Sequence, residues 1–320
     1  MGKTLLFFTL IIIIPLTLSG QKIDNIASFR QITSDSYFRF NYENDYFNAT
    51  DRDYTQGYSF ELVTPWLAKN PANHLLVKVP DSKYQYGVAI EHIGFTPYRY
   101  VSDEIQYGDR PFASAIMLKS FVIAADTIHK SRFSSALSIG LIGPGAFGGE
   151  MQTEIHRATG NKIPEGWRHQ IRNDLVLNYE VNYEKRLLRY RNNLSVQATG
   201  KLRIGTLNTN ASAGLAVMLG VFSTDYNPNK NDRKYQLYLY SQPLLSVVGY
   251  DATLQGGFFN RKSPYTISSS AIERFTLQHN YGLILQTRTM YFEYSRSAIT
   301  REFNTGRAAG WGGVKIGFRF

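Results

Sequence analysis

Two short stretches of the sequence combine residue types that together can hydrolyse an ester. The first contains Asn44, Asp45 and Thr55, and the second contains Gln152 and His156. An imidazole takes up and releases a proton near neutral pH, so His156 can serve as the base that activates water. Gln152 stands four residues earlier and, on a helix, shares its face, where it can orient the histidine or the water. The pattern therefore favours a hydrolase site.

Asp45 offers the hard oxygen donor that a calcium ion prefers, and Asn44 or Thr55 can add further oxygen ligands. A bound Ca²⁺ would polarise the carbonyl group of an ester. The chain has no cysteine, so a thiolate-bound metal is excluded. Two simpler interpretations stay open, in which His156 is a surface histidine and Asn44 with Asp45 is only a solvated acidic turn. Metal-ligand spacing is absent from the other histidines, which are His74, His92, His129, His169 and His279.

The N-terminus has the pattern of a secretory signal peptide. Lys3 precedes an apolar run from Leu5 to Leu16, and the small residues Ser19 and Gly20 follow as a cleavage site. The alternative is a membrane anchor, but the run is short for a span of about 20 residues. We therefore expect residues 1–20 to be a signal peptide and residues 21–320 to form one exported domain.

Polar and apolar residues alternate along many segments of the exported part. Between residues 37 and 43, for example, Phe38, Phe40 and Tyr42 share one strand face, and Arg39 and Asn41 lie on the other. Such two-faced strands, in a chain with 22 Tyr and 20 Phe, are typical of an outer-membrane barrel. Twelve strands are predicted, at residues 36–44, 54–64, 84–95, 113–125, 132–142, 174–187, 194–205, 211–222, 234–249, 272–285, 287–298 and 310–320.

The predicted fold is thus an all-β, 12-stranded antiparallel transmembrane β-barrel, with a short helix at residues 146–159 in an extracellular loop. Asn44 ends the first strand and Thr55 begins the second, so both lie at the outer rim. The helix that carries Gln152 and His156 follows the fifth strand at the same rim. We expect Phe147 and Met151, on a neighbouring helical face, to pack against the barrel.

The net charge of +10 suggests attraction to an anionic surface. Export makes nucleic acid an unsuitable partner, whereas anionic lipid or lipopolysaccharide fits. We expect a monomer in the outer membrane of a Gram-negative-type bacterium.

Four motifs follow one another along the chain: Glu43-Asn44-Asp45, Asp53-Tyr54-Thr55-x-Gly57, Gly108-Asp109-Arg110-Pro111-Phe112-Ala113, and Gly143-Pro144 with Gln152-x-x-x-His156-Arg157. Their order and spacing resemble the lipid A 3-O-deacylase family. The resemblance implies a twelve-stranded outer-membrane barrel that removes the 3′-O-linked acyl group of lipid A by calcium-dependent hydrolysis. It also implies that the active-site positions are Asn44, Asp45, Thr55, Gln152 and His156, with the histidine activating water.

The sequence departs from the family pattern where substrate phosphate would be bound. The family has an adjacent Lys-Arg pair in the loop before Gly108, whereas here Arg99 is the nearest cation. Arg110 is a second candidate, which either binds phosphate or stabilises the loop. Two other functions stay open, a barrel phospholipase and a non-enzymatic porin or binding barrel. A phospholipase of the usual kind needs a serine beside the histidine, and none flanks His156.

Overall fold

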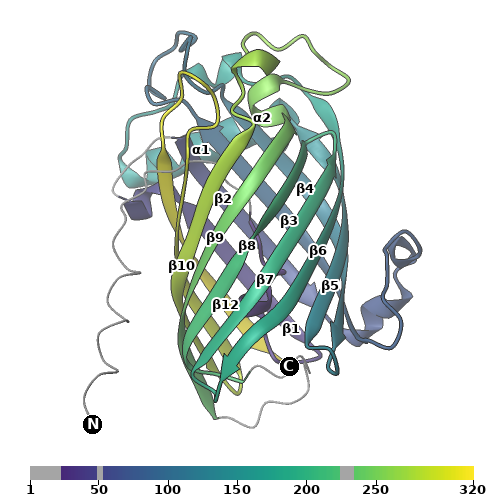
Figure 1. Cartoon of the computed structure of the whole chain (residues 1–320). Helices are drawn as coiled ribbons and strands as arrows, with labels where there is room; N and C mark the ends of the chain where they lie inside the picture. The colour runs from purple at the N-terminus through teal and green to yellow at the C-terminus, as the bar shows by residue number, and fades with distance from the viewer. Residues whose placement is uncertain (1–22, 49–52, 224–233) are drawn as a thin grey trace.

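Twelve antiparallel strands close into one barrel in the computed structural model, which describes residues 23–48, 53–223 and 234–320 (Figure 1). The predicted signal peptide, residues 1–20, lies outside these described residues. The strands are β1 (Tyr37–Asn44), β2 (Asp53–Val63), β3 (Lys83–Thr96), β4 (Ala113–Asp126), β5 (Ser131–Ile142), β6 (Asp174–Tyr190), β7 (Leu194–Gly205), β8 (Asn208–Val221), β9 (Tyr235–Asp251), β10 (Phe275–Thr287), β11 (Met290–Ile299) and β12 (Ala309–Arg319).

Two α-helices and several single-turn 3₁₀ helices lie in the connections. They are α1 (Gly148–Thr159) and α2 (Ala252–Gln255), with η1 (Ser28–Arg30), η2 (Asp45–Asn48), η3 (Pro65–Lys69), η4 (Pro71–His74), η5 (Pro144–Ala146), η6 (Gly166–His169) and η7 (Ser269–Ala271). Within the described part of the chain, no helix is long and apolar enough to cross a membrane.

The barrel closes where β1 pairs with β12, from Tyr37 opposite Arg319 to Asn44 opposite Gly312. The start of β1 and the end of β12 therefore lie at one end of the barrel, and α1 and α2 lie at the other (Figure 1). Each predicted strand overlaps an observed one in the same order, with ends that differ by three residues at most. The predicted fold class is confirmed.

The alternating pattern places apolar side chains outside and polar side chains in the lumen. In β1, Arg39 and Asn41 are buried inside the barrel, whereas Phe38 is 37% exposed on the outer surface. An outer-membrane barrel requires this arrangement because its outer face meets lipid.

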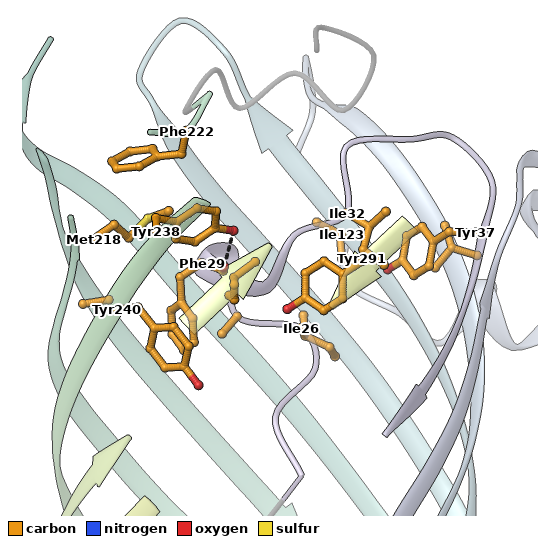
Figure 2. Close-up of a cluster of buried hydrophobic side chains, with 14 of the residues drawn as sticks. Ile26, Phe29, Ile32, Tyr37, Ile123, Met218, Phe222, Tyr238, Tyr240 and Tyr291 are labelled. Atoms are coloured by element: carbon orange, nitrogen blue, oxygen red, sulfur yellow. Dashed lines mark hydrogen bonds between the residues drawn. The ribbon is translucent and has the colours of Figure 1, made fainter. Parts of the chain in front are cut away.

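The N-terminal segment, residues 23–36, runs through the lumen before β1 begins. Phe29 is fully buried, its ring stacks on Tyr240 with 4.3 Å between centroids, and its carbonyl oxygen accepts a hydrogen bond from Tyr238 at 2.9 Å. Ile26 and Ile32 pack in the same cluster (Figure 2). Sequence reasoning did not anticipate this segment, which fills the barrel near the end where β1 starts.

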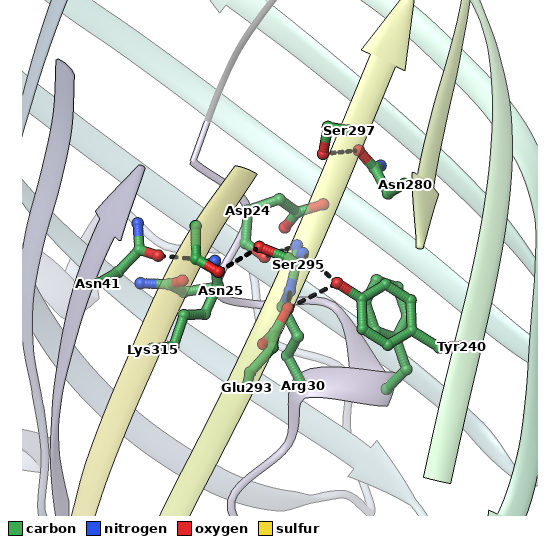
Figure 3. Close-up of polar contacts among 12 residues, drawn as sticks. Asp24, Asn25, Arg30, Asn41, Tyr240, Asn280, Glu293, Ser295, Ser297 and Lys315 are labelled. Atoms are coloured by element: carbon green, nitrogen blue, oxygen red, sulfur yellow. Dashed lines mark hydrogen bonds and ion pairs between the residues drawn. The ribbon is translucent and has the colours of Figure 1, made fainter. Parts of the chain in front are cut away.

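Polar contacts hold the same segment to strands around the lumen. The guanidinium of Arg30 lies 2.8 Å from the carboxylate of Glu293 on β11 and donates to the hydroxyl of Tyr240 at 2.8 Å (Figure 3). Asp24 pairs with Lys201 on β7 at 2.5 Å. A buried charge needs such a partner to offset its lost hydration. The N-terminal segment therefore occupies the lumen and pairs its charged side chains with strand residues of opposite charge.

Connecting loops fold over the other end of the barrel. Arg110 is buried there, pairs with Glu302 at 2.9 Å, donates to Thr253 at 3.1 Å and lies 4.1 Å from the ring centre of Phe95. These contacts join the loop before β4 to α2 and to the loop before β12. Of the two roles foreseen for Arg110, the geometry supports loop stabilisation.

Candidate functional site between α1 and the barrel wall

Helix α1 packs against the outside of the barrel, not over its opening. Along β4, Lys119 faces the lumen, where it pairs with Glu91, so Ser114 faces outward. A Cβ atom added to Gly148 would lie 2.4 Å from Cβ of Ser114, which shows how closely the helix approaches the wall. Gly148 makes this approach possible because it lacks a side chain, and Gly149 likewise leaves room for Trp167.

The helix begins two residues later than predicted. Phe147 adopts a left-handed backbone conformation with φ of 59°, which separates the 3₁₀ turn η5 from α1. The expectation that Phe147 packs against the barrel was wrong, because this kink leaves its side chain 59% exposed. The buried face of α1 instead consists of Gly148, Gly149, Gln152 and His156.

Two side chains of the outer wall hold the start of α1. Nε2 of His92 donates to the carbonyl oxygen of Ala146 at 2.8 Å, and its ring stacks on Tyr58 with centroids 5.5 Å apart. Gln56 reaches the carbonyl oxygen of Gly148 at 3.5 Å. These contacts fix η5 and the start of the helix to β3 and β2.

Asn44, Thr55 and Gln152 form one chain of hydrogen bonds. Nδ2 of Asn44 donates to the carbonyl oxygen of Thr55 and, at 3.1 Å, to the hydroxyl of Tyr42. Nε2 of Gln152 donates to Oγ1 of Thr55 at 2.6 Å, while its Oε1 accepts from the indole N–H of Trp167 at 2.7 Å. Asn44 therefore donates both amide hydrogens to protein and Gln152 donates one, so these side chains link the barrel wall to the helix.

His156 follows Gln152 by one helical turn on the same buried face and is 5% exposed. Its Nδ1 lies 2.6 Å from the carbonyl oxygen of Lys162, and its ring meets Tyr100 edge-on at 5.5 Å. A carbonyl oxygen can only accept, so Nδ1 carries a proton in this contact. In the neutral ring, Nε2 then holds the lone pair, as a general base requires.

Asp45 is fully buried directly after β1 and next to Asn44. Its carboxylate and the oxygen atoms of Thr55 are hard donors that suit Ca²⁺. Among the described residues, no group of three or more His, Cys, Asp or Glu side chains gathers to form a metal site. A calcium site built from Asp45 and Thr55 therefore stays a prediction.

The two cations considered for substrate phosphate, Arg99 and Arg110, have different surroundings. Arg99 is exposed and precedes Tyr100, which contacts His156. Arg110 lies in its buried ion pair with Glu302. A phosphate-binding role for Arg99 or Arg110 stays a prediction.

Sequence reasoning missed three contributors to this site: Trp167, Tyr100 and His92. Trp167 lies in the short 3₁₀ helix η6 and Tyr100 in a turn, and neither has a periodic sequence pattern that marks a partner. His92 lacks metal-ligand spacing, and its contact with Ala146 depends on the position of α1. The one available signal was the pair Gly148-Gly149, which is unfavourable inside a helix and thus indicates close packing.

A family model described as outer membrane protein LpxR matches residues 5–320. No curated protein sequence matches the chain. Among solved structures, LpxR from Salmonella typhimurium aligns with a TM-score of 0.71 and 19% identity, covering 89% of this chain and 100% of that one. The beta domain of the Bordetella autotransporter Brka aligns with a TM-score of 0.43 and 7% identity, covering 89% and 98%.

The family match spans nearly the whole sequence, and the Salmonella protein shares its barrel fold. The chain thus belongs to the LpxR family of outer-membrane proteins.

Proposed function

We propose that the protein is an outer-membrane esterase that removes the 3′-O-linked acyl group of lipid A. The observation that carries this proposal is His156, whose Nδ1 is held by the carbonyl of Lys162 on a helix that packs against the lipid-facing wall. A base at this position can act on an ester that stays in the membrane. Family membership supports a lipid A substrate.

In the proposed reaction, Nε2 of His156 takes a proton from water as the water oxygen attacks the ester carbonyl carbon. The tetrahedral intermediate then collapses, and the proton passes from the imidazole to the departing sugar oxygen. The products are a free fatty acid and a free sugar hydroxyl group. Asn44 and Gln152 hold the wall and the helix in register while this happens.

Calcium is part of the proposal, with Asp45 and Thr55 as its ligands. When bound, the ion would polarise the ester carbonyl and stabilise the negative oxygen of the intermediate. Asn44 is not assigned to the metal, because its Nδ2 donates to Thr55 and Tyr42 and its Oδ1 accepts from the N–H of Tyr46.

The acyl chain of the substrate has an apolar surface to lie on beside the site. Below Asn44, the outer faces of β1 and β2 carry Tyr42, Tyr58 and Phe60, and the rings of the two tyrosines stack at 5.6 Å. Phe60 is 49% exposed. A lipid can therefore enter sideways from the membrane.

The two competing functions have less support. A porin needs an open lumen, whereas here the N-terminal segment occupies it through Phe29 and the Arg30–Glu293 pair. A phospholipase of the usual kind needs a serine that the histidine can activate. His156 instead has Lys162 and Tyr100 as its neighbours.

The test is mass spectrometry of lipid A from cells that express the chain, compared with cells that carry His156→Ala. We expect loss of the 3′-O-linked acyl group with the native chain and a rate about 10²–10⁴-fold lower with the variant. His279→Ala is the matched control, since His279 lies on β10 and bonds Ser241. Full activity of a folded His156→Ala protein would remove the histidine from the mechanism, and unchanged lipid A with the native chain would refute the activity.

A further inference from the structure

The connection between β2 and β3, residues 64–82, lies against the outer surface of the barrel. It leaves the end of the barrel opposite α1 and protrudes beside β5 and β6, at the lower right of Figure 1. Most connections at that end are short turns, such as residues 191–193 between β6 and β7. We call residues 64–82 the flank segment. Its length and its position on the outer surface distinguish it from these turns.

Outward-facing hydroxyl groups of three strands hold the flank segment in place. Nδ2 of Asn70 donates to Ser120 on β4 at 3.1 Å, and Ser135 on β5 donates to the carbonyl oxygen of Val77 at 2.8 Å. Tyr179 on β6 donates to the carbonyl oxygen of Leu75 at 3.1 Å and accepts from the N–H of Val77 at 3.0 Å. Polar groups on a lipid-facing wall are costly unless they are paired, so segment and wall stabilise each other.

The flank segment is itself two-sided. Leu67 and Leu76 are buried against the protein. The opposite side exposes large apolar side chains, with Trp66 71% and Leu75 65% exposed. Val77 and Val79 extend this apolar side toward β3.

Charged residues accompany this apolar surface. Lys69 and Lys78 are exposed within the segment, Lys83 follows at the start of β3, and Asp81 is the acidic residue among them. Tryptophan with flanking lysines is the composition of protein surfaces at the boundary between lipid headgroups and acyl chains. Basic side chains there attract anionic lipid.

We propose that the flank segment is an interfacial anchor that seats in the periplasmic leaflet of the outer membrane and binds anionic phospholipid. The barrel spans this membrane, and α1 with the candidate site marks the outer end, so the flank segment faces the inner leaflet. Because it lies on the lipid-facing wall, its exposed apolar side meets lipid. Its lysines then reach the phosphate groups at the surface.

Trp66 provides a direct reporter, because Trp167 and Trp311 are 6% and 2% exposed. The protein is reconstituted in vesicles of phosphatidylcholine and phosphatidylglycerol that carry bromine either near the headgroup or deep in the chains. The difference in tryptophan fluorescence between the native protein and Trp66→Phe gives the signal of Trp66. We expect strong quenching by the shallow bromine, weaker quenching by the deep bromine and little quenching by aqueous acrylamide.

Efficient quenching by acrylamide with no effect of either brominated lipid would place Trp66 in water and overturn the proposal. Lipid selectivity gives a second test, in which Lys69→Gln and Lys78→Gln are compared with Lys262→Gln in an outer loop. We expect each flank variant to bind phosphatidylglycerol about fivefold more weakly in native mass spectrometry. Equal binding by flank and control variants would remove the anionic-lipid part of the proposal.

Discussion

Replacing Gly148 by alanine tests whether the contact between α1 and the barrel wall sets the activity. The new Cβ would lie 2.4 Å from Cβ of Ser114, 2.7 Å from its Oγ and 3.0 Å from Cη2 of Trp167. Carbon atoms in ordinary contact are about 3.5–4.0 Å apart. The start of the helix must therefore move away from β4 by about 1 Å.

Gln152 and His156 lie on the same helix as Gly148, so this displacement moves them as well. Gln152 would lose its 2.6 Å contact with Thr55, and His156 would shift relative to Asn44. A misplacement of about 1 Å in a catalytic group can lower the rate about 10²-fold. The free energy of unfolding should fall much less, by about 1–3 kcal/mol, because overpacking here affects one surface helix.

The assay is the initial rate of lipid A deacylation by purified protein in detergent, with heat-dependent gel mobility as the check on folding. Gly200→Ala is the matched control, because an added Cβ at Gly200 has no atom within 4 Å. Ser114→Gly removes the closest obstacle, so adding it to Gly148→Ala should restore much of the rate. Native activity in folded Gly148→Ala would refute the reasoning, and so would a double variant no more active than the single one.

Two further predictions concern the metal and the lumen. Chelation should stop deacylation and added Ca²⁺ should restore it, while Asp45→Ala should resist this rescue; full activity in excess chelator would exclude the metal. The native protein in a planar lipid bilayer should conduct no ions, because the segment around Phe29 and Arg30 occupies the lumen. Stable current steps of porin size would contradict this second prediction.

The strands could be predicted because their information is local. Side chains alternate along a strand, so Phe38 and Phe40 lie on one face and Arg39 and Asn41 on the other. Once the barrel closes, the first face meets lipid and the second faces the lumen. The number of strands followed from counting such segments. The positions of Asn44 and Thr55 at neighbouring strand ends followed from that count, and the structure joins them by a hydrogen bond.

The rest depended on contacts between distant parts of the chain. The spacing of Ile26, Phe29 and Ile32 does not reveal that they enter the lumen, because their partners are strands far along the sequence. The direction of α1 likewise depends on the left-handed Phe147, a conformation that non-glycine residues rarely adopt. The sequence pattern placed the start of the helix within two residues of its observed position, but the packing face was assigned wrongly.

The segment inside the barrel also constrains the order of assembly. Arg30 contacts Glu293, so residues near the two ends of the chain must meet before the interior is complete. The seam between β1 and β12 is formed by the first and last strands, and joining such distant partners is slow. Loops anchored by Arg110 cover the opening at the α1 end, whereas the segment leads into β1 at the opposite end. Because this seam forms slowly, we expect the strands to fold around the N-terminal segment before β1 and β12 pair.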